Sequence, residues 1–311
     1  MKRILVTGAC GQIGSELVMF LRNIYGNDNI LATDIKDVKE GPLLNGPFEK
    51  LNVLDDKAFY QTAKNFKADT VIHLAALLSA VGEKNPQLAW TINMGGLVNG
   101  LETARELNTK FFTPSSIGCF GPSTPKKNTP QDTLQRPETM YGVTKVSGEL
   151  LCDYYYKRFG VDTRGVRFPG LISYVTPPGG GTTDYAVDIY YKAAKGDTYS
   201  CFIKEGTYMD MMYMPDALNA VHKLLEADGD KLKHRNAFNI TAMSFAPEHV
   251  YAEIKKLIPD FKMVYNVDPV RQKIAESWPD SIDSSDAKEE WGFTFEYDLP
   301  KMTKDMLEKL K

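Results

Sequence analysis

The sequence predicts an α/β protein with a doubly wound parallel sheet and a second, smaller α/β domain. Short apolar runs alternate with stretches of helical periodicity through the first half of the chain, which is the pattern of βαβ units. A glycine-rich turn follows the first apolar run directly and opens a helix. After about residue 170 the alternation gives way to glycine- and proline-rich sequence, which indicates the start of another domain.

Five apolar runs are predicted to form strands of the sheet, and one weaker segment joins them. The runs lie at residues 4–7, 30–33, 70–75, 111–113 and 166–168, and residues 48–53 are the expected third strand. Strands of a parallel sheet are buried on both faces, so they read as continuous apolar runs. The first domain is therefore expected to span residues 1–170, with later segments returning to it.

The second domain, mainly residues 171–311, is predicted to bind the substrate at the carboxyl edge of the sheet. Helices are expected at residues 183–194, 216–225, 247–257 and 300–310, and strands at 237–240 and 263–266. A glycine-rich loop at residues 177–181 is interpreted either as a lid or as a flexible crossover. The run Met211-Met212-Tyr213-Met214 is expected to pack in the core, because methionine fills irregular gaps.

Composition limits the classes of function that this chain can have. It has 311 residues, 43% of them hydrophobic and 25% charged, so it can bury a substantial core. The formal net charge is −3 with no long basic run, so neither nucleic acid nor an anionic membrane is an expected partner. The four cysteines and four histidines are scattered, and no metal site is expected. The apolar runs are too short for a secretory signal or a membrane span, so a cytoplasmic protein with a small-molecule substrate is expected.

The glycine-rich turn has the spacing GxxGxxG, formed by Gly8, Gly11 and Gly14. Glycines permit a tight turn and a close approach of the backbone to a pyrophosphate, and N–H groups at the start of the helix bind the anion. The spacing is looser than the common GxGxxG, so the turn alone leaves a purely structural role open. Asp34 follows Gly14 by 20 residues, where a carboxylate accepts hydrogen bonds from an adenosine ribose. Asp34 also repels a 2′-phosphate, so a Rossmann domain that prefers NAD to NADP is predicted, although Lys36 weakens that preference.

Tyr141 and Lys145 lie four residues apart in a predicted helix, and Ser115 and Ser116 follow the fifth strand. Residues at i and i+4 share one face of a helix, so the Lys145 ammonium can lie beside the Tyr141 phenol and favour its ionised form. A hydroxyl, a phenol and an ammonium are the groups needed to remove the proton of an alcohol while a hydride leaves its carbon. A surface helix pair and strand-capping serines are the structural alternatives.

These features resemble the extended short-chain dehydrogenase/reductase family over nearly the whole chain. The resemblance rests on the glycine turn, Asp34, Ser116, the Tyr141/Lys145 pair, Leu74-Ala75-Ala76 and Asn93-Met94-Gly95-Gly96. It implies that Ser116 polarises the substrate oxygen, Tyr141 is the acid/base, and Lys145 binds the nicotinamide ribose. NAD is the implied cofactor, and the expected cofactor-binding residues are Gly8, Gly11, Gln12, Ile13, Gly14, Asp34, Val53, Leu74, Ala75, Ala76, Asn93, Tyr141, Lys145 and Phe168.

Three later segments are similar to those of one branch of this family, the short-chain L-threonine 3-dehydrogenases. They are residues 167–173, 180–186 and 211–217, and Thr182-Thr183-Asp184 is the most specific stretch. The resemblance implies oxidation of the β-hydroxyl of L-threonine to 2-amino-3-oxobutyrate. Asp184 is expected to meet the substrate ammonium, although an N-cap role for Thr183 and Asp184 remains open. The expected substrate-binding residues are Ser79, Ser116, Tyr141, Thr182, Thr183 and Asp184.

Other functions remain open. A sugar-nucleotide 4-epimerase uses the same cofactor, and cations that would suit its diphosphate are available as Arg167, Lys192, Lys195, Lys204 and Arg271. A dehydratase is disfavoured, because Ile117-Gly118 stands where such enzymes carry an Asp-Glu pair. A non-catalytic NAD-binding sensor is the alternative from another class. The resemblance also suggests a homodimer through the helix that carries Tyr141 and its neighbour at residues 93–105.

Overall fold

The computed structural model describes residues 1–177 and 179–311, and the chain divides into two compact units. Unit 1 comprises Met1–Ser115, Thr139–Val166 and Val221–Phe238. Unit 2 comprises Ser116–Glu138, Arg167–Ala220 and Asn239–Lys311. The units are interleaved along the chain, and the sequence suggested a main boundary near residue 170 with later segments returning to the first domain. Pro178, which belongs to the predicted loop at residues 177–181, lies outside the described residues.

Unit 1 is built on a six-stranded parallel sheet in the order β3-β2-β1-β4-β5-β7. The strands are β1 (Ile4–Thr7), β2 (Ile30–Asp34), β3 (Phe48–Lys50), β4 (Thr70–His73), β5 (Lys110–Phe112) and β7 (Thr163–Arg164). β1 lies between β2 and β4, with Ile4 opposite both Ile30 and Thr70. The strand order reverses between β1 and β4, which is the switch point of a doubly wound sheet. The predicted fold class is confirmed.

The last predicted strand of this sheet is wrong. The sixth strand is β7, which pairs with β5 through Phe111 and Thr163. Residues 166–168 form a separate strand, β8 (Val166–Phe168), outside the six-stranded sheet. The chain leaves the sheet at Gly165, where a Cβ atom would lie 2.4 Å from the carbonyl oxygen of Thr113. Only glycine allows so close an approach of two backbones.

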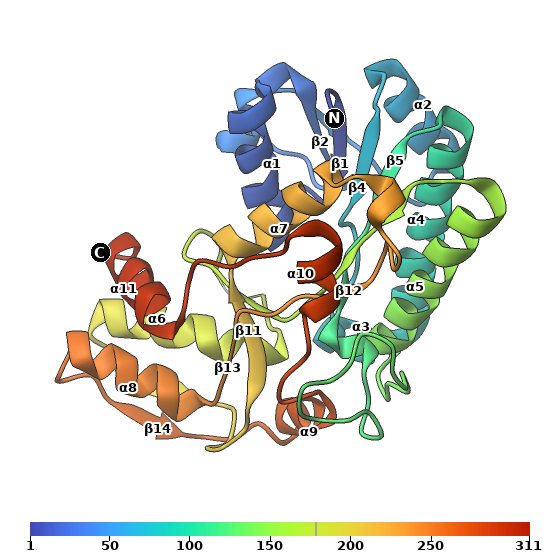
Figure 1. The fold of residues 1–311 in the computed structure, drawn as a ribbon. Helices are drawn as coiled ribbons and strands as arrows, with labels where there is room; N and C mark the ends of the chain where they lie inside the picture. Colours follow the sequence, from blue (N-terminus) through green and yellow to red (C-terminus); the bar gives the residue numbers. More distant parts are fainter. Residues whose placement is uncertain (178) are drawn as a thin grey trace. The chain divides into compact units, whose positions relative to one another are not determined.

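Helices cover both faces of the sheet in unit 1 (Figure 1). They are α1 (Gln12–Tyr25), α2 (Asp56–Phe66), α3 (Ser79–Lys84), α4 (Pro86–Leu107) and α5 (Met140–Phe159). α1 lies on one face and buries Leu17 and Leu21. α2, α4 and α5 lie on the other face, where an apolar cluster includes Phe59, Leu101 and Phe111. This layered packing fixes the carboxyl ends of the strands, where ligands bind in such sheets.

Unit 2 contains a three-stranded sheet in the order β13-β11-β9 and a parallel pair, β10 and β14. Its strands are β9 (Gly170–Ile172), β10 (Tyr199–Cys201), β11 (Met209–Tyr213), β13 (Met243–Phe245) and β14 (Met263–Tyr265). Its helices are α6 (Tyr185–Lys195), α8 (Pro247–Leu257), α9 (Pro269–Ser277), α10 (Ser285–Trp291) and α11 (Leu299–Lys309). The Met-Met-Tyr-Met run is buried, as predicted, and most of it belongs to β11. At the unit boundaries the chain forms β6 (Ser115–Ser116), α7 (Met214–Glu226) and β12 (Phe238–Asn239).

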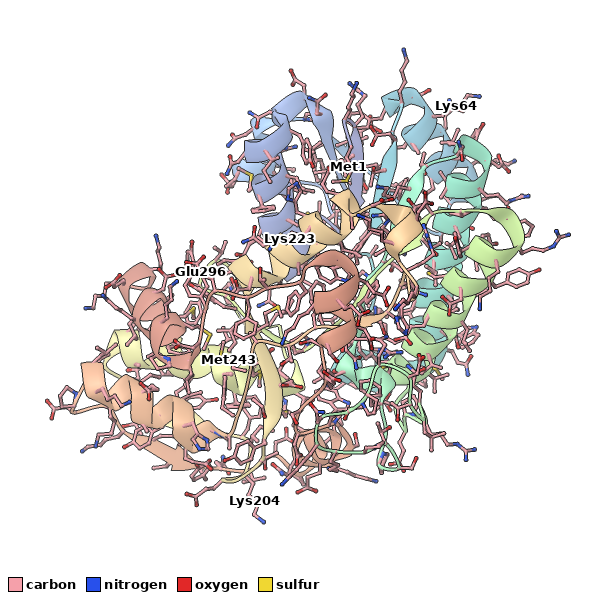
Figure 2. The ribbon with its side chains drawn as sticks, in the orientation of Figure 1. Met1, Lys64, Lys204, Lys223, Met243 and Glu296 are labelled. Carbon is pink, nitrogen blue, oxygen red and sulfur yellow. The ribbon has the colours of Figure 1, made fainter. Side chains whose placement is uncertain are left out.

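Charged side chains extend from the surface of each unit, as Lys64 on α2 and Lys204 in unit 2 do (Figure 2). The Nζ atom of Lys64 lies 5.3 Å from the centroid of the Tyr60 ring, so the charge stays in water while the stem covers an aromatic face. Within residues 1–177 and 179–311, none of the helices combines the length and the apolar character that a membrane crossing requires.

Candidate active site

The glycine-rich turn joins β1 to α1 with no room for side chains at two positions. Gly8 has a φ of +70°, and a Cβ there would lie 2.7 Å from the backbone nitrogen of Ala75. A Cβ on Gly14 would lie 2.2 Å from the carbonyl oxygen of Gly8. Any larger residue at either position would push the helix, the turn and the neighbouring chain apart.

The amino end of α1 offers backbone N–H groups to a ligand. Gly11 is its N-cap, and among the described residues no side chain caps this end. Its first turn holds no acidic residue and includes Gln12, Ile13 and Gly14, all predicted to bind the cofactor. The first N–H groups of a helix have no partner within it, and together with the helix dipole they favour an anion.

A pocket of about 430 Å³ opens beside this turn within unit 1. That volume is typical of a small-molecule site. Seven of the predicted cofactor-binding residues line it, namely Gly8, Gly11, Asp34, Val53, Leu74, Ala75 and Ala76. Sequence reasoning did not assign several other lining residues, among them Cys10, Ile35, Leu51, Leu77 and Ile92. An apolar residue at these positions gives no sequence signal that separates a ligand contact from ordinary packing.

Asp34 ends β2 and lies on the wall of this pocket. Its Oδ2 atom accepts a hydrogen bond from the backbone nitrogen of Cys10 at 2.9 Å, and Oδ1 accepts one from that of Lys36 at 3.0 Å. Each carboxylate oxygen has a further lone pair for a ribose hydroxyl. Burial and the Asp34 carboxylate raise the pKa of the Cys10 thiol to about 11, so this cysteine stays protonated near neutral pH. A glycine cradle for a pyrophosphate and a fixed carboxylate for a ribose together fit NAD.

Tyr141 and Lys145 lie at the amino end of α5. The hydroxyl of Thr139 caps the helix by accepting a hydrogen bond from the backbone nitrogen of Gly142 at 3.1 Å. The Nζ atom of Lys145 lies 5.4 Å from the centroid of the Tyr141 ring and donates to the carbonyl oxygen of Pro114 at 2.7 Å. The two side chains share one helix face, and the ammonium lies over the phenol ring.

Ser116 directly follows Ser115 at the point where the chain passes into unit 2. Its Oγ atom accepts a hydrogen bond from the backbone nitrogen of Gly118 at 3.2 Å and so caps the 3-10 turn Ile117–Cys119. An oxygen that accepts from Gly118 keeps its own proton for another acceptor. Ser116 can therefore cap this turn and donate to a substrate oxygen as well.

The side chain of Asn93, a predicted cofactor-binding residue, forms hydrogen bonds with other residues of the protein. Its Oδ1 atom accepts from the backbone nitrogen of Leu77 at 2.7 Å, and its Nδ2 atom lies 3.2 Å from both Leu77 O and Thr144 Oγ1. These bonds connect the chain beyond β4 to α4 and α5. Asn93 thus shapes the site by holding its walls.

His73, at the end of β4, was not assigned a role from the sequence. Its Nδ1 atom lies 2.9 Å from the hydroxyl of Thr7. Burial and the charge of Lys145 lower the pKa of His73 to about 3, so the imidazole is neutral near neutral pH. Its Nε2 atom is buried and has no hydrogen-bond partner among the described residues.

The predicted substrate-binding residues lie in both units. Thr182, Thr183 and Asp184 form a 3-10 turn before α6 in unit 2. The Oδ2 atom of Asp184 accepts from the backbone nitrogens of Gly180 and Gly181 at 2.7 and 2.6 Å, so the carboxylate holds the loop before the helix. Thr182 is 2% exposed, and its Oγ1 atom has no partner among the described residues. In unit 1, the buried Ser79 begins α3, and in unit 2 Phe168 is buried in β8.

The chain belongs to the NAD dependent epimerase/dehydratase family, whose family model matches residues 4–241. This confirms the resemblance to extended short-chain dehydrogenases/reductases and identifies an NAD-dependent oxidoreductase with NAD as its cofactor. A relative in Staphylococcus saprophyticus, described as an uncharacterized epimerase/dehydratase, is 62% identical over 312 residues, which cover 100% of this chain and 98% of that protein.

Several solved structures are similar to this chain in both sequence and fold. The chain is similar to L-threonine dehydrogenase from Clostridium difficile, with 67% identity, a TM-score of 0.98 and coverage of 100% of this chain and 98% of that one. It is also similar to the holo form of a GalE-like L-threonine dehydrogenase from Cupriavidus necator, with 48% identity, a TM-score of 0.97 and coverage of 99% and 100%.

Proposed function

We propose that this chain is an L-threonine 3-dehydrogenase that oxidises the β-hydroxyl of L-threonine to give 2-amino-3-oxobutyrate. The observation that carries the reaction type is the Lys145 ammonium held 5.4 Å from the centroid of the Tyr141 ring. The choice of substrate is supported by 67% identity, over the whole chain, to a protein described as L-threonine dehydrogenase.

In this proposal the residues divide the work between binding and proton transfer. When bound, NAD supplies the acceptor for the hydride. Asp34 and the amino end of α1 hold the adenosine ribose and the pyrophosphate. Tyr141, as the phenolate, accepts the proton of the β-hydroxyl, and the Lys145 ammonium stabilises the phenolate charge. The Ser116 hydroxyl donates a hydrogen bond to the substrate oxygen and orients it.

The recognition of an amino acid is assigned to Thr182, Thr183 and Asp184 of unit 2 and to Ser79 of unit 1. Thr182 has a buried hydroxyl without a partner among the described residues, and such a group is costly unless a ligand satisfies it. Asp184 uses Oδ2 for the loop nitrogens, so Oδ1 is the oxygen assigned to the substrate ammonium. Thr183 and Ser79 are assigned to the carboxylate by neutral hydrogen bonds.

The direct test is the initial rate of NADH formation by the purified protein with NAD and L-threonine. D-threonine, L-allo-threonine and L-serine serve as substrate controls. Tyr141→Phe should keep NAD binding and lose about 10²- to 10⁴-fold in kcat, the usual contribution of a general acid/base. Tyr156→Phe removes a phenol oxygen from an exposed position of the same helix and should leave kcat unchanged. Full activity of Tyr141→Phe would sink the assignment.

A sugar-nucleotide 4-epimerase is the second candidate, because the matching family includes epimerases. Such an enzyme completes its cycle without releasing reduced cofactor. The discriminating measurement is therefore the amount of NAD released when the purified protein is denatured. Stoichiometric NAD together with no turnover of L-threonine would favour the epimerase.

We also propose a homodimer through α4 and α5. Trp90 on α4 is 43% exposed, and Leu150 and Tyr154 on α5 are 63% and 53% exposed. Large apolar side chains grouped on neighbouring helices support an interface between two copies. Sedimentation at micromolar concentration tests this, and a monomer would contradict it.

A further inference from the structure

Two side chains of α5 form hydrogen bonds with two consecutive residues of the chain beyond β5, Pro114 and Ser115. The Nζ atom of Lys145 donates to the carbonyl oxygen of Pro114 at 2.7 Å. One turn further along the helix, the Oε1 atom of Glu149 accepts a hydrogen bond from the hydroxyl of Ser115. Lys145 and Glu149 are four residues apart, so they extend from one face of α5 toward the same segment. All four residues belong to unit 1.

Glu149 is buried, and a carboxylate is costly to bury. Its exposed fraction is 6%, and that of Ser115 is 7%. A buried acid is tolerated when its oxygens are hydrogen-bonded, and hydrogen bonds to an ionised carboxylate are stronger than those between neutral groups. An apolar side chain would fill the same space without this cost. Packing alone therefore does not account for an acid at this position, whereas its hydrogen bond with Ser115 does.

A cavity of about 40 Å³ lies beside this contact. Lys145, Ser115, Glu149 and His73 are among the residues on its wall. The volume is enough for an ordered water molecule, and such a water would satisfy the Nε2 atom of His73, which has no hydrogen-bond partner within the described part of the chain. The cavity also means that close packing does not confine Ser115 on this side. The backbone of Ser115 is also held by the pairing of β6 with β8, and the hydrogen bond to Glu149 is the constraint that acts on its side chain.

We propose that Glu149 is a positioning residue for Ser116. Its hydrogen bond to Ser115 fixes the position of the backbone from which Ser116 continues, and it keeps residues 114–116 aligned with Lys145. Ser116 is the next residue along the chain, so its backbone moves with that of Ser115. A displacement of about 1 Å at a reacting group slows an enzyme by about 10²-fold. The inference rests on the proposed function, because it concerns the hydroxyl and the ammonium that this function uses.

The test compares variants of the full chain that remove one or both partners of the bond. Glu149→Ala should lower kcat by about 10²-fold. Glu149→Gln keeps a side-chain oxygen that can accept from Ser115, so it should restore most of the lost rate. Ser115→Ala should resemble Glu149→Ala, and the double variant should lose no more than either single one, because both remove the same interaction. Glu106→Gln, at an exposed position of α4, is the matched control and should match the wild type.

The dissociation constant for NAD should stay unchanged in all these variants, because the glycine turn and Asp34 are untouched. A loss of general structural integrity would instead weaken NAD binding and lower Tm along with kcat. A kcat of Glu149→Ala within about two-fold of the wild type would overturn the proposal. Additive losses in the double variant would overturn it too, since they would show that the two residues act separately.

A readout without substrate separates this inference from the proposed function. Amide hydrogen exchange of the peptide that contains residues 111–117 should be faster in Glu149→Ala and in Ser115→Ala than in the wild type or Glu149→Gln. Unchanged exchange in Ser115→Ala would refute the positioning role even if Glu149→Ala fails to fold. A wild type that does not oxidise L-threonine would refute the proposed function and leave this result standing.

Discussion

Gly14 sets how closely α1 approaches the turn before it, and replacing it by alanine tests that packing. A Cβ at this position would lie 2.2 Å from the carbonyl oxygen of Gly8 and 2.8 Å from the Cα atom of Ala9. Atoms in ordinary contact lie about 3.5 Å apart, so α1 must move by about 1 Å. Both obstructing atoms belong to the backbone and cannot turn aside as a flexible side chain does. The free energy of unfolding should fall by about 2–3 kcal/mol, the upper part of the range for overpacked cores.

Urea unfolding followed by circular dichroism measures this loss, and calorimetric titration measures NAD binding. NAD should bind at least about 10-fold more weakly to Gly14→Ala, equivalent to about 1.4 kcal/mol, because the N–H groups that meet the pyrophosphate move with α1. Gly82→Ala in α3 is the control, since its Cβ would lie 3.4 Å from the Cβ of Ala89. That is ordinary contact, and alanine favours a helix over glycine by up to about 1 kcal/mol. A Gly14→Ala variant as stable as the wild type, with equal NAD affinity, would refute the reasoning.

Asp34→Ala should weaken NAD binding by about 10-fold or more and reduce the preference for NAD over NADP. A titration in which Asp34→Ala binds NAD as tightly as the wild type would contradict this. Burial raises the pKa of Asp210 to about 7, so between about pH 4 and 7 the folded protein holds a proton that the unfolded chain has lost. The free energy of unfolding should therefore fall as pH rises through this window, by up to about 4 kcal/mol, and Asp210→Asn should flatten the slope in urea titrations. His73, whose pKa is lowered to about 3, stays neutral while an unfolded histidine gains a proton below about pH 6.5. Its contribution to stability should be lost as pH falls from 6.5 toward 3, and an imidazole that titrates near pH 6.5 in an NMR experiment on the folded protein would contradict this.

Within the six-stranded sheet, sequence reasoning found the five strands that contain apolar residues and missed the sixth, β7, which contains none. β1 is buried along its whole length and reads as a continuous apolar run. β7 is equally buried but consists of Thr163 and Arg164. The guanidinium of Arg164 pairs with the carboxylate of Asp162, and its Nη1 atom also donates to the carbonyl oxygens of Leu224 and Ala227, which lie 60 and 63 residues further along the chain. A local pattern cannot reveal partners at that distance, so the strand was assigned to residues 166–168 instead.

In the candidate site too, the sequence predicts the contacts between residues close in the chain and does not predict those between distant residues. Tyr141 and Lys145 share a helix face, so their spacing alone predicts their proximity, and the structure places them as expected. Asp34 could be placed because strand ends in a βαβ unit are themselves a local pattern. The contact between Ser115 and Glu149 joins residues 34 positions apart, and the internal bonds of Asn93 are equally dependent on tertiary structure. Such pairings emerge only when the strands and helices are assembled.

The interleaving of the two units has a consequence for how this chain folds during its synthesis. The last strand of the six-stranded sheet has been made once Arg164 leaves the ribosome, yet unit 1 also contains Val221–Phe238. Unit 2 combines Ser116–Glu138 with Arg167–Ala220 and Asn239–Lys311, so a further 173 residues follow Glu138 before this unit is complete. A nascent chain that ends before Phe238 therefore has neither unit complete and exposes apolar surface that the finished protein covers. During that interval of translation the exposed apolar surface makes the chain prone to aggregation.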